Sequence, residues 1–388
     1  MPAPASPGRS GVEWRLGAES GPVDIAALVK EAARFEERIR RAKHSLGHPA
    51  FEWYPYDTLS ALGHLEKLLT GANRGLVDGR GRVLDMGSQD GELAFFLESL
   101  GYQVVAVDHP AYNHNGMRGI RALKAALGSA VAIHELDADR PFTLPHDTYD
   151  LVFFLGILYH LRNPFYVLEE LARRTTRCFL STRVARRFPD GSAMPANLAL
   201  AYLLAEEELN QDNSNYFIFS ERGLRVMLDR AHWKIRDYVS LGDTSLSDPV
   251  RLDRDERAFC LLESRYDRLA NLQLLAGWHD SEETGWRWTG REFGVRVRAG
   301  VGRRVLTMKL YVAEESVRRL GAITLRATAN GVVLPPAVYD TAGMESYLRE
   351  LESESGEVEL RFRLDKALAP EESDDRERGI IVVSIQVA

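Results

Sequence analysis

The sequence predicts an α/β protein with a Rossmann-like, doubly wound sheet, an N-terminal helical extension and a separate C-terminal all-β sandwich. Strand-like apolar stretches alternate with helix-like stretches over about residues 80–265, which is typical of a parallel sheet covered on both faces. A glycine-containing turn follows the first of these strands and opens a helix. After about residue 270 the pattern changes to short, often alternating strands separated by turn residues, and this indicates a β-sandwich.

The bulk composition describes an ordinary globular protein. The 388 residues are too many for one small core, so we expect two or three domains. The formal net charge of −7 argues against a general nucleic-acid binder, because such binding relies on Lys and Arg to neutralise phosphates. The net charge does not exclude a local basic face. Cys178 and Cys260 stand in apolar surroundings, so we expect them in the core and not in a disulfide or zinc site.

The N-terminal region is expected to contain a disordered tail over 1–20, rich in Pro, Gly and Ser, and a helical cap over 21–78. The tail has no apolar signal core, and the chain has no run of about 18 apolar residues. We therefore expect a cytoplasmic protein with no membrane span. Apolar residues recur at helical spacing from Ile25 to Ile39, after Asp24, which can cap the helix.

The far end of this first helix is basic. Arg38, Arg40, Arg41 and Lys43 gather there. They are either a solvated face whose charge suits a helix C-terminus or a contact for a substrate phosphate or RNA.

The α/β region is expected over 79–268. Its strand candidates are 82–86, 103–108, 130–136, 150–156, 177–183, 233–241 and 257–265. Its helices are expected around 91–100, 115–128, 163–174 and 221–231, the last capped by Ser220. No long helix separates the last two strands, so we expect them to form an antiparallel pair at one edge. The sandwich, over 269–388, is expected to use the segments 285–290, 292–300, 303–313, 322–331, 357–364 and 379–387.

A cofactor site is predicted where the first strand ends. Asp85 lies near that end, Gly87 and Gly91 follow before the helix, and the second strand ends in Asp108. Glycines let a ligand approach the backbone closely, and an acidic side chain can accept both hydroxyls of a ribose. The sequence therefore predicts a nucleoside-containing ligand here.

The first helical turn after this loop is acidic, with Asp90 and Glu92 in it. A dinucleotide would place its diphosphate at this helix N-terminus. Two carboxylates would repel a diphosphate, whereas a zwitterionic or cationic ligand tolerates them. We expect a ligand of the second kind.

The segment 85–91, with the sequence DMGSQDG, resembles motif I (D-x-G-x-G-x-G) of class I S-adenosylmethionine-dependent methyltransferases, with Gln89 in place of a glycine. The stretch 104–109 resembles their second strand, and Tyr149-Asp150 resembles the pair that opens their fourth. The resemblance covers about 80–265 and implies S-adenosyl-L-methionine (SAM) as cofactor; a Rossmann-like domain with another nucleotide, or with none, is the alternative. The implied cofactor-binding residues are Asp85, Gly87, Ser88, Gln89, Gly91, Asp108 (at the ribose), His109, Asp137 (at the adenine amino group), Leu155 and Gly156.

The catalytic candidates follow the strand at 150–156. Methyl transfer is an in-line displacement in which the enzyme aligns the nucleophile and, for a hydroxyl, removes its proton. Tyr159 and His160 would lie at the carboxyl edge of the sheet, beside the methyl group. His160 is either a general base or substrate orienter, or a residue that only packs at a helix start. We expect metal-independent chemistry, because no His, Asp and Glu set has metal-ligand spacing.

The stretch 158–171 resembles the LYHxxxP segment of the tRNA wobble-uridine carboxymethyltransferases and their methyltransferase relatives, and 215–233 resembles a further segment of that group. The resemblance implies that Asn215, also a catalytic candidate, and Tyr216 line the acceptor pocket; packing of their loop is the alternative.

One stretch departs from that group. The tRNA carboxymethyltransferases have a stretch rich in Lys and Trp ahead of motif I, whereas residues 52–62 of this chain contain no lysine. The departure favours ordinary SAM over the carboxylated donor of the tRNA enzymes. Trp53, Tyr54 and Tyr56 in this stretch either cover the active site or pack in the core.

The opening and closing stretches of the sandwich, 277–298 and 374–387, resemble an accessory module of glycosyltransferases and other glycan-modifying enzymes, with Arg378 in place of a leucine. Three tryptophans, expected to be exposed, either stack on sugar rings or fill the core or a domain interface: Trp278, Trp286 and Trp288. The acidic run 371–377 is either a solvated loop or a calcium site.

These observations predict a SAM-dependent O-methyltransferase that acts on a glycan or a glycosylated small molecule with the help of His160. One alternative is a tRNA wobble-uridine modifying methyltransferase, against which the acidic balance, the missing lysine and the sandwich count. Another is a catalytically silent glycan-binding or scaffold protein, against which the intact set of Asp85, Gly87, Gly91 and Asp108 counts. The expected partner is therefore a small-molecule or glycan acceptor, with tRNA second.

Overall fold

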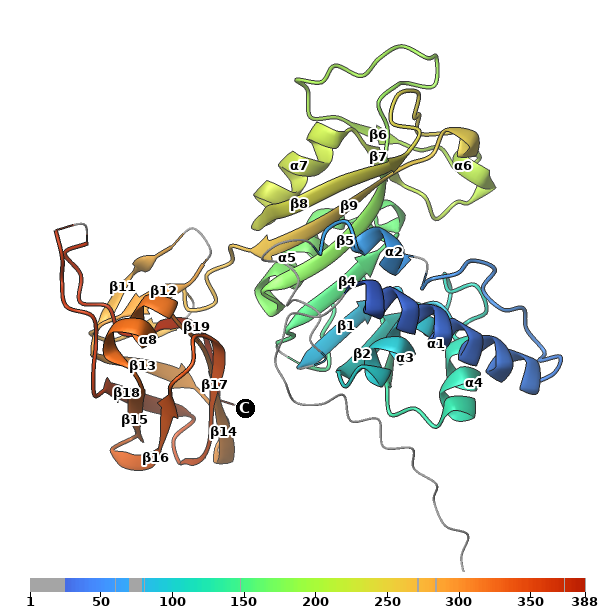
Figure 1. The fold of residues 1–388 in the computed structure, drawn as a ribbon. Helices are drawn as coiled ribbons and strands as arrows, with labels where there is room; N and C mark the ends of the chain where they lie inside the picture. The colour runs from blue at the N-terminus through green and yellow to red at the C-terminus, as the bar shows by residue number, and fades with distance from the viewer. Residues whose placement is uncertain are drawn as a thin grey trace, which may run out of the picture.

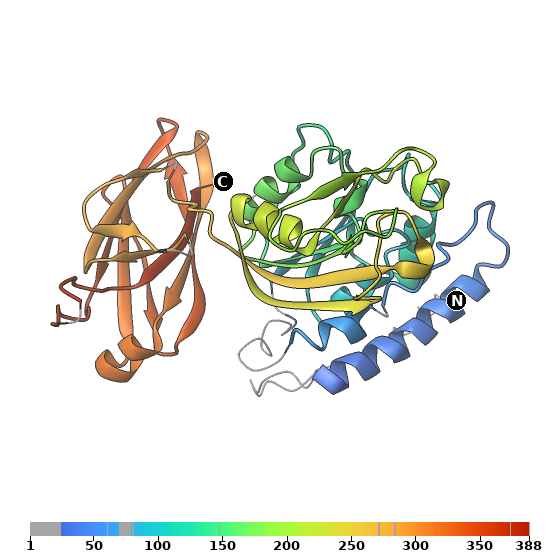
Figure 2. The ribbon, with the colours of Figure 1, turned by 90° about the horizontal axis from the view of Figure 1, so that it is seen from above.

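The computed structural model describes residues 25–59, 61–69, 79, 81–146, 148–270, 272–282, 285–372 and 374–387. These residues form an α/β body and a β-sandwich that lie side by side, joined by the segment after strand β9 (Figures 1 and 2). The architecture confirms the predicted fold class. The predicted disordered tail, 1–20, and the capping residue Asp24 lie outside the described residues.

A nine-stranded sheet forms the centre of the α/β body. Its parallel part has the order β3-β2-β1-β4-β5. These strands are β1 (Arg82–Met86), β2 (Gln103–Asp108), β3 (Ala132–Glu135), β4 (Leu151–Leu155) and β5 (Arg177–Val184). The chain leaves β1 toward β2 and later returns to β4 on the other side of β1. In open parallel sheets, ligands bind at the carboxyl ends of the strands at such a reversal.

Helices cover both faces of the sheet (Figure 2). Four helices share one hydrophobic core with the sheet: α1 (Ile25–Ser45), α2 (Ala61–Leu65), α3 (Glu92–Ser99) and α4 (Arg118–Leu127). On the opposite face, α5 (Pro164–Arg174) and α7 (Glu221–Arg230) pack in a second core. The predicted amphipathic helix is α1, whose residues Leu28, Ala32, Phe35 and Ile39 are buried. Ser220 caps α7, as predicted, by accepting a hydrogen bond from the Gly223 N–H.

The far edge of the sheet is antiparallel, as predicted. Strand β8 (Trp233–Gly242) pairs with β9 (Glu256–Ser264), and β9 pairs with β5. Because β9 runs against β5, its first residues lie beside the carboxyl end of β5. The sequence patterns did not predict β6 (Ala201–Leu203), the helix α6 (Glu208–Gln211) or β7 (Phe217–Phe219), since elements of three or four residues are too short to show a period.

Both cysteines are core residues, as predicted. Cys178 on β5 and Cys260 on β9 are buried. Burial raises the pKa of both thiols, that of Cys260 to about 12, so neither is a thiolate at neutral pH.

The C-terminal region forms two five-stranded sheets around one core. One sheet has the order β10-β13-β18-β15-β16 and the other β11-β12-β19-β14-β17. The strands are β10 (Gln273–Leu274), β11 (Trp278–Ser281), β12 (Arg287–Thr289), β13 (Glu292–Arg298), β14 (Gly302–Val312), β15 (Ile323–Ala329), β16 (Val332–Tyr339), β17 (Gly343–Ser353), β18 (Glu357–Leu364) and β19 (Ile381–Val387). The predicted sandwich is confirmed. Helix α8 (Glu314–Leu320) and the edge strands β16 and β17 were missed; β16 contains two prolines, which only edge strands tolerate well.

The three tryptophans of the sandwich are half-buried, so the expectation that they are exposed is wrong. Trp278 donates its Nε1–H to the Gly294 carbonyl at 2.6 Å and packs edge-on against Phe293. Arg378 lies over the ring of Trp288, and the Nε1 atom of Trp286 is buried. Their apolar faces are largely taken up by the sandwich itself.

Two acidic residues of the run 371–377 form ion pairs with arginines. Asp374 pairs with Arg376 at 2.8 Å, and Glu371 with Arg319 at 2.5 Å. These pairs support a solvated, ion-paired loop. Between the two parts of the molecule, Lys309 of β14 forms an ion pair with Asp150, next to the start of β4.

Candidate active site

Two adjoining cavities open at the carboxyl edge of the parallel strands. The β2 cavity, of about 520 Å³, is lined by residues that include Asp108, His109 and Asp137. The β9 cavity, of about 530 Å³, is lined by residues that include Asp85, Ser88 and Arg257. Each has the size of a small-molecule site. Their shared wall includes Tyr54, Gly87, Ile157, Tyr159 and His160.

The loop between β1 and α3 borders both cavities. Gly87 has a φ of 82°, and a Cβ there would lie 2.0 Å from Ile157 Cδ1, so glycine alone fits. Gln89 also has a positive φ, 48°, which is uncommon for a residue with a side chain. Its N–H donates to Asp108 Oδ2 at 2.8 Å, and its Oε1 accepts from the His114 N–H at 3.3 Å. Gln89 thus replaces the usual glycine and ties the loop to the segment after β2.

Gly91 has a different reason to be glycine. Its φ is 80°, and a Cβ there would lie 2.5 Å from Ile120 Cγ1 on α4. It lines neither cavity. Close packing of α3 against α4 therefore requires this glycine.

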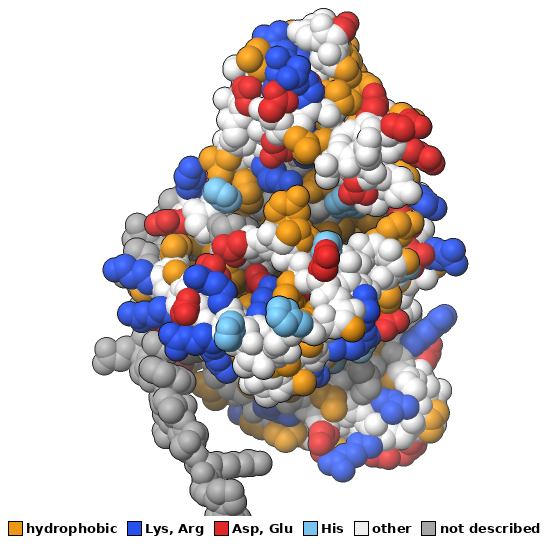
Figure 3. All heavy atoms as spheres, turned by 90° about the vertical axis from the view of Figure 1, so that its right-hand side faces the viewer, with side chains coloured by type: hydrophobic (Ala, Val, Ile, Leu, Met, Phe, Trp, Pro, Cys, Tyr) orange, Lys and Arg blue, Asp and Glu red, His pale blue; other side chains and the backbone are white. Residues whose placement is uncertain are grey.

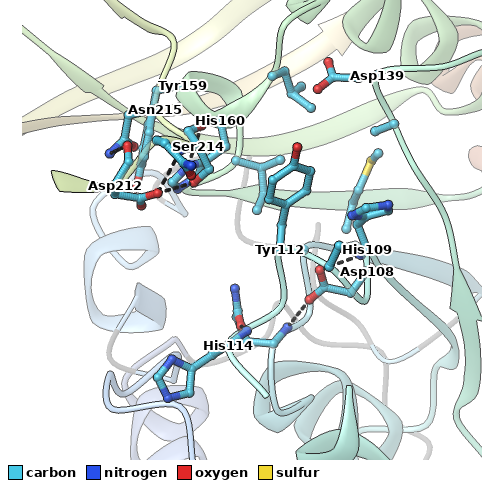
Figure 4. A pocket seen from close by; sticks show the side chains of 18 of the residues that line it. Asp108, His109, Tyr112, His114, Asp139, Tyr159, His160, Asp212, Ser214 and Asn215 are labelled. Atoms are coloured by element: carbon cyan, nitrogen blue, oxygen red, sulfur yellow. Dashed lines mark hydrogen bonds between the residues drawn. The ribbon is translucent and has the colours of Figure 1, made fainter. Parts of the chain in front are cut away.

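The carboxylate of Asp108 is held in one position by three donors. Oδ1 accepts from the His109 N–H at 2.8 Å, and Oδ2 accepts from the Gln89 N–H at 2.8 Å and from Asn113 Nδ2 at 2.9 Å. Burial raises the pKa of Asp108, and these hydrogen bonds oppose the shift. Asp108 and His109 face the β2 cavity from one side (Figure 4).

Asp85, near the end of β1, has the opposite environment. Its side chain is buried, and Oδ2 has no hydrogen-bond partner among the described residues. Burial, and then the charge of Asp108, raise the pKa of Asp85 to about 7. Ser88 Oγ is also buried and has no hydrogen-bond partner among the described residues. Buried polar atoms without partners are rare, and here two of them belong to residues that line the β9 cavity.

Asp90 and Glu92 do not present charge to a ligand. Glu92 pairs with Lys43 of α1, with Nζ and Oε1 2.6 Å apart. Asp90 accepts from the Tyr54 N–H at 2.8 Å and from Asn115 Nδ2 at 2.7 Å. Asp90 and Glu92 line neither cavity, and their contacts bind the N-terminal segment to the sheet. The expectation that they would repel a diphosphate stays a prediction.

The other basic residues near the end of α1 make local contacts. Arg40 and Arg41 pair with Glu37 one turn away, at 3.5 and 3.2 Å. Arg38 lies over the ring of Phe35. These contacts favour the solvated-face interpretation.

The three aromatic residues predicted either to cover the site or to pack in the core, Trp53, Tyr54 and Tyr56, have different roles. Tyr54 and Tyr56 line both cavities, and burial raises the pKa of Tyr54 to about 12. Trp53 packs edge-on against Phe51 and beneath Lys43. Two of the three residues therefore border the site, and the third packs.

His160 ends the 3-10 helix η2 (Leu158–His160) and lines both cavities. Figure 4 shows it beside Ser214 in the wall of one of them. Its Nδ1 lies 3.2 Å from the Ser214 carbonyl oxygen and 3.0 Å from Ser214 Oγ. The carbonyl can only accept, and the Ser214 hydroxyl donates to Asp212 Oδ1 at 2.6 Å. Nδ1 therefore carries the proton, which leaves the Nε2 lone pair free. Burial lowers the pKa of His160, against the opposing effect of Asp212, so the neutral ring prevails at neutral pH.

Tyr159 and Asn215, the other two catalytic candidates, also line the β2 cavity. The ring of Tyr159 packs on His160 at 4.3 Å, and its hydroxyl accepts from Arg257 Nη2 at 3.4 Å. Asn215 is buried and donates its Nδ2 hydrogens to two backbone carbonyls of the preceding loop, both at 3.2 Å. Its amide nitrogen therefore holds this loop in place.

The remaining candidates lie apart from the β2 cavity. Leu155 and Gly156, where β4 ends, line the β9 cavity. Tyr216 lines neither of the two cavities; its hydroxyl accepts from Arg162 Nε at 2.7 Å.

Three functional candidates were not predicted from the sequence. Arg257 lies near the start of β9, and because β9 runs antiparallel to β5, this start lies at the carboxyl edge of the parallel strands. The predicted antiparallel pair could have indicated this position. Asp212 and Ser214 lie in an irregular loop, and no sequence pattern placed them beside His160.

Neither a metal cluster nor a membrane-spanning helix occurs in the described ranges. No group of three or more His, Cys, Asp or Glu side chains among these residues is arranged to hold a metal ion. Within the same residues, every helix is too short or too polar to cross a membrane.

The doubly wound sheet, with the loop after β1 placed between two small-molecule cavities, agrees with the class of protein that a sequence comparison shows, a methyltransferase. The sequence profile of a family described as "Methyltransferase domain" matches residues 37–238, which is more than half of the chain. The chain belongs to this family.

The chain is also similar to solved structures, two of which are described as methyltransferases. The N-terminal domain of EvdMO1, in a structure with S-adenosylhomocysteine (SAH) and D-fucose, is 14% identical, with a TM-score of 0.39 and coverage of 59% of this chain and 97% of that one. A putative methyltransferase from Bacillus halodurans is 18% identical (TM-score 0.38, coverage 53% and 98%). The Burkholderia thailandensis 1,6-didemethyltoxoflavin-N1-methyltransferase is 17% identical (TM-score 0.35, coverage 64% and 92%). No curated protein sequence matches the chain.

Proposed function

We propose that the protein transfers the methyl group of SAM to a hydroxyl of a sugar or a glycosylated small molecule, and that His160 removes the hydroxyl proton. One observation carries this proposal: a neutral histidine, with Nδ1 bound to acceptors, lies at the boundary between two cavities of small-molecule size. A general base needs an available lone pair at the reacting group, and His160 Nε2 supplies one.

The site residues suit the donor in the following way. Asp108 and Asp137 in the β2 cavity would hold the ribose and the adenine amino group, and Asp85 and Ser88 in the β9 cavity would face the ammonium of the amino-acid end. The unpartnered Asp85 Oδ2 supports this assignment, because it is an acceptor that no described residue uses. When bound, SAM supplies an electrophilic methyl group.

The cavity walls favour a ring-shaped polar acceptor. Aromatic faces meet the apolar C–H surface of sugars well, and hydroxyl and amide groups exchange hydrogen bonds with sugar hydroxyls. The β2 cavity offers both kinds of group, including Tyr54, Tyr56, Tyr112, Tyr159, Asn213 and Ser214.

His160 then acts as follows. Its Nε2 would accept the hydroxyl proton as the acceptor oxygen forms its bond to the methyl carbon; the bond between that carbon and the donor sulfur would break, and SAH would leave. The imidazolium formed keeps its Nδ1–H on the Ser214 acceptors, and the nearby Asp212 carboxylate stabilises the new positive charge. General base catalysis of this kind contributes about 10²- to 10⁴-fold in rate.

A tRNA acceptor is the competing proposal. The net charge of −7 counts against it. On the face of the molecule shown in Figure 3, Lys and Arg side chains gather toward the lower left, with Asp and Glu side chains among them. The carboxylates among these cations weaken their attraction for a phosphate backbone.

Two experiments test the proposal. Isothermal titration calorimetry with SAM and SAH tests the donor; binding of neither ligand would contradict it and would favour the silent scaffold. A labelled methyl group, offered with total tRNA and with cell-envelope glycan, tests the acceptor. We expect label in the glycan fraction. Label in tRNA alone would contradict a sugar acceptor and would show that tRNA is the acceptor.

A further inference from the structure

The β9 cavity contains a guanidinium group whose hydrogen-bonding capacity is barely used. Among the described residues, Arg257 makes one hydrogen bond, from Nη2 to the Tyr159 hydroxyl, and it is long, at 3.4 Å. Its ion pair is with Asp255, whose Oδ2 lies 3.7 Å from Nε. A guanidinium carries five N–H donors in a fixed fork. Most of the donors of Arg257 are therefore available to a ligand.

Asp255 does not neutralise Arg257 alone. Asp255 Oδ1 also lies 3.4 Å from Nε of the buried Arg183. Neither of these two atoms has a hydrogen-bond partner among the described residues. Two guanidinium groups thus share one carboxylate, and of the two only Arg257 lines the β9 cavity. Asp255 is therefore only a partial counter-charge for Arg257.

Arg257 reaches across the sheet to the end of β4. A Cβ on Gly156, just after β4, would lie 3.5 Å from Arg257 Nη1 and 3.7 Å from the Tyr159 hydroxyl. Because glycine leaves this space empty, the guanidinium faces open volume next to β1. Asp85 and Ser88, with their unpartnered oxygens, line the same cavity. The cavity therefore combines acceptors near β1 with strong donors over β4.

We propose that Arg257 is the anion-binding residue of this active site and that its guanidinium binds a carboxylate in the β9 cavity. The geometry of a guanidinium matches a carboxylate in a bidentate pair. One source of the carboxylate is the amino-acid end of the donor, whose ammonium would then face Asp85. The other source is an acidic acceptor such as a uronic acid. This inference rests on the proposed methyltransferase function and sharpens what its site recognises.

The test compares the wild-type protein with Arg257→Gln and Arg257→Lys by calorimetry. The ligands are SAH, the SAH analogue that lacks the α-carboxylate, and 5′-methylthioadenosine, which lacks the whole amino-acid end. Arg236→Gln is the matched control, because Arg236 lies at the other end of the β8–β9 pair, forms an ion pair with Glu263 and lines neither cavity. Thermal unfolding checks that each variant is folded.

If the donor supplies the carboxylate, Arg257→Gln weakens SAH binding by about 30-fold or more and leaves both carboxylate-free ligands unchanged. Arg257→Lys keeps the positive charge but loses the forked pair of donors, so its SAH affinity should lie between those of the wild type and Arg257→Gln. If the acceptor supplies the carboxylate, SAH binding is unchanged. The SAH-saturated wild type then binds glucuronate more tightly than glucose, and Arg257→Gln loses this preference.

The proposal is overturned if Arg257→Gln binds SAH like the wild type and shows the same preference between glucuronate and glucose. An equal loss in Arg236→Gln would also overturn it, because the loss would then come from a general change in charge or packing. Failure of the wild type to bind SAH at all would instead contradict the donor assignment in the proposed function. The two failures are therefore distinguishable.

Discussion

The carboxylates near the ends of β1 and β2 line adjoining cavities and have opposite surroundings. Asp108 accepts three hydrogen bonds from the protein, whereas one oxygen of Asp85 accepts none among the described residues. His160 at the boundary follows the first pattern, because Ser214 binds its Nδ1. Arg257 in the β9 cavity follows the second, since its contacts are few and long.

This difference separates two ways of making a binding site. In the β2 cavity the protein itself satisfies the carboxylate of Asp108 and Nδ1 of His160, which fixes their positions before a ligand arrives and lowers the cost of binding. His109 Nδ1 and Arg183 Nε, whose residues line the same cavity, have no partner among the described residues. In the β9 cavity several polar groups lack partners, which is unfavourable in the free protein. A ligand that supplies the missing partners is recognised through that difference.

The largest expected effect concerns the boundary between the cavities. His160→Ala removes the proposed base and should lower kcat by about 10²- to 10⁴-fold, while SAH affinity changes little. Steady-state kinetics and calorimetry measure the two quantities. His44→Ala, an exposed histidine outside both cavities, is the control. Unchanged turnover in His160→Ala would return His160 to a packing role.

The next largest effect concerns the loop shared by both cavities. Gly87→Ala forces a left-handed backbone on a residue with a Cβ, at a cost of about 1–2 kcal/mol, and the new Cβ displaces Ile157. We expect SAH affinity to fall by at least about tenfold. Gly128→Ala is the matched control, because its φ is 63° but nothing lies within 4 Å of the point that a Cβ would occupy. Equal SAH affinity in both variants would show that the contact with Ile157 is irrelevant.

The two carboxylates themselves should differ in how much their removal changes stability. Asp108→Asn leaves at least one buried N–H without an acceptor and should destabilise the fold by about 1–3 kcal/mol. Asp85→Asn removes a poorly solvated carboxylate, so it should cost less stability, or increase it at pH 8, while it weakens SAH binding. Urea unfolding and calorimetry measure these effects. Equal losses of stability would contradict the contrast between the cavities.

A last expected effect is a pH dependence that originates in Asp85. Its pKa is about 7 in the folded protein, against 3.8 for an aspartate free in water, so the folded protein binds the extra proton between these values. Stability therefore falls as the pH rises from about 4 to 7. SAH affinity should rise over the upper part of this range, by at most about tenfold per pH unit, because the ammonium prefers the ionised carboxylate. Asp85→Asn should abolish this part of both trends, and an unchanged profile would assign them to other groups.

Much of the fold was predictable because its signals are local. Apolar strands that alternate with helices, the amphipathic α1 and the helix cap at Ser220 were all visible as patterns of a few residues. Short or edge elements were not: β7 has three residues, and β16 carries prolines. Their formation depends on pairing with strands distant in the chain, and sequence periodicity does not record such pairing.

The sequence by itself determined the class of fold, the loop at Gly87 and the acidic residues that close the first two strands, because these depend on backbone conformation and short-range spacing. Only the tertiary structure decided how each charge is used. It placed Lys43 against Glu92, Ser214 and Asp212 behind His160, and Arg257 over Gly156. These contacts join residues dozens of positions apart, or residues of an irregular loop, so the strength of each charge in the site is set by packing and solvation.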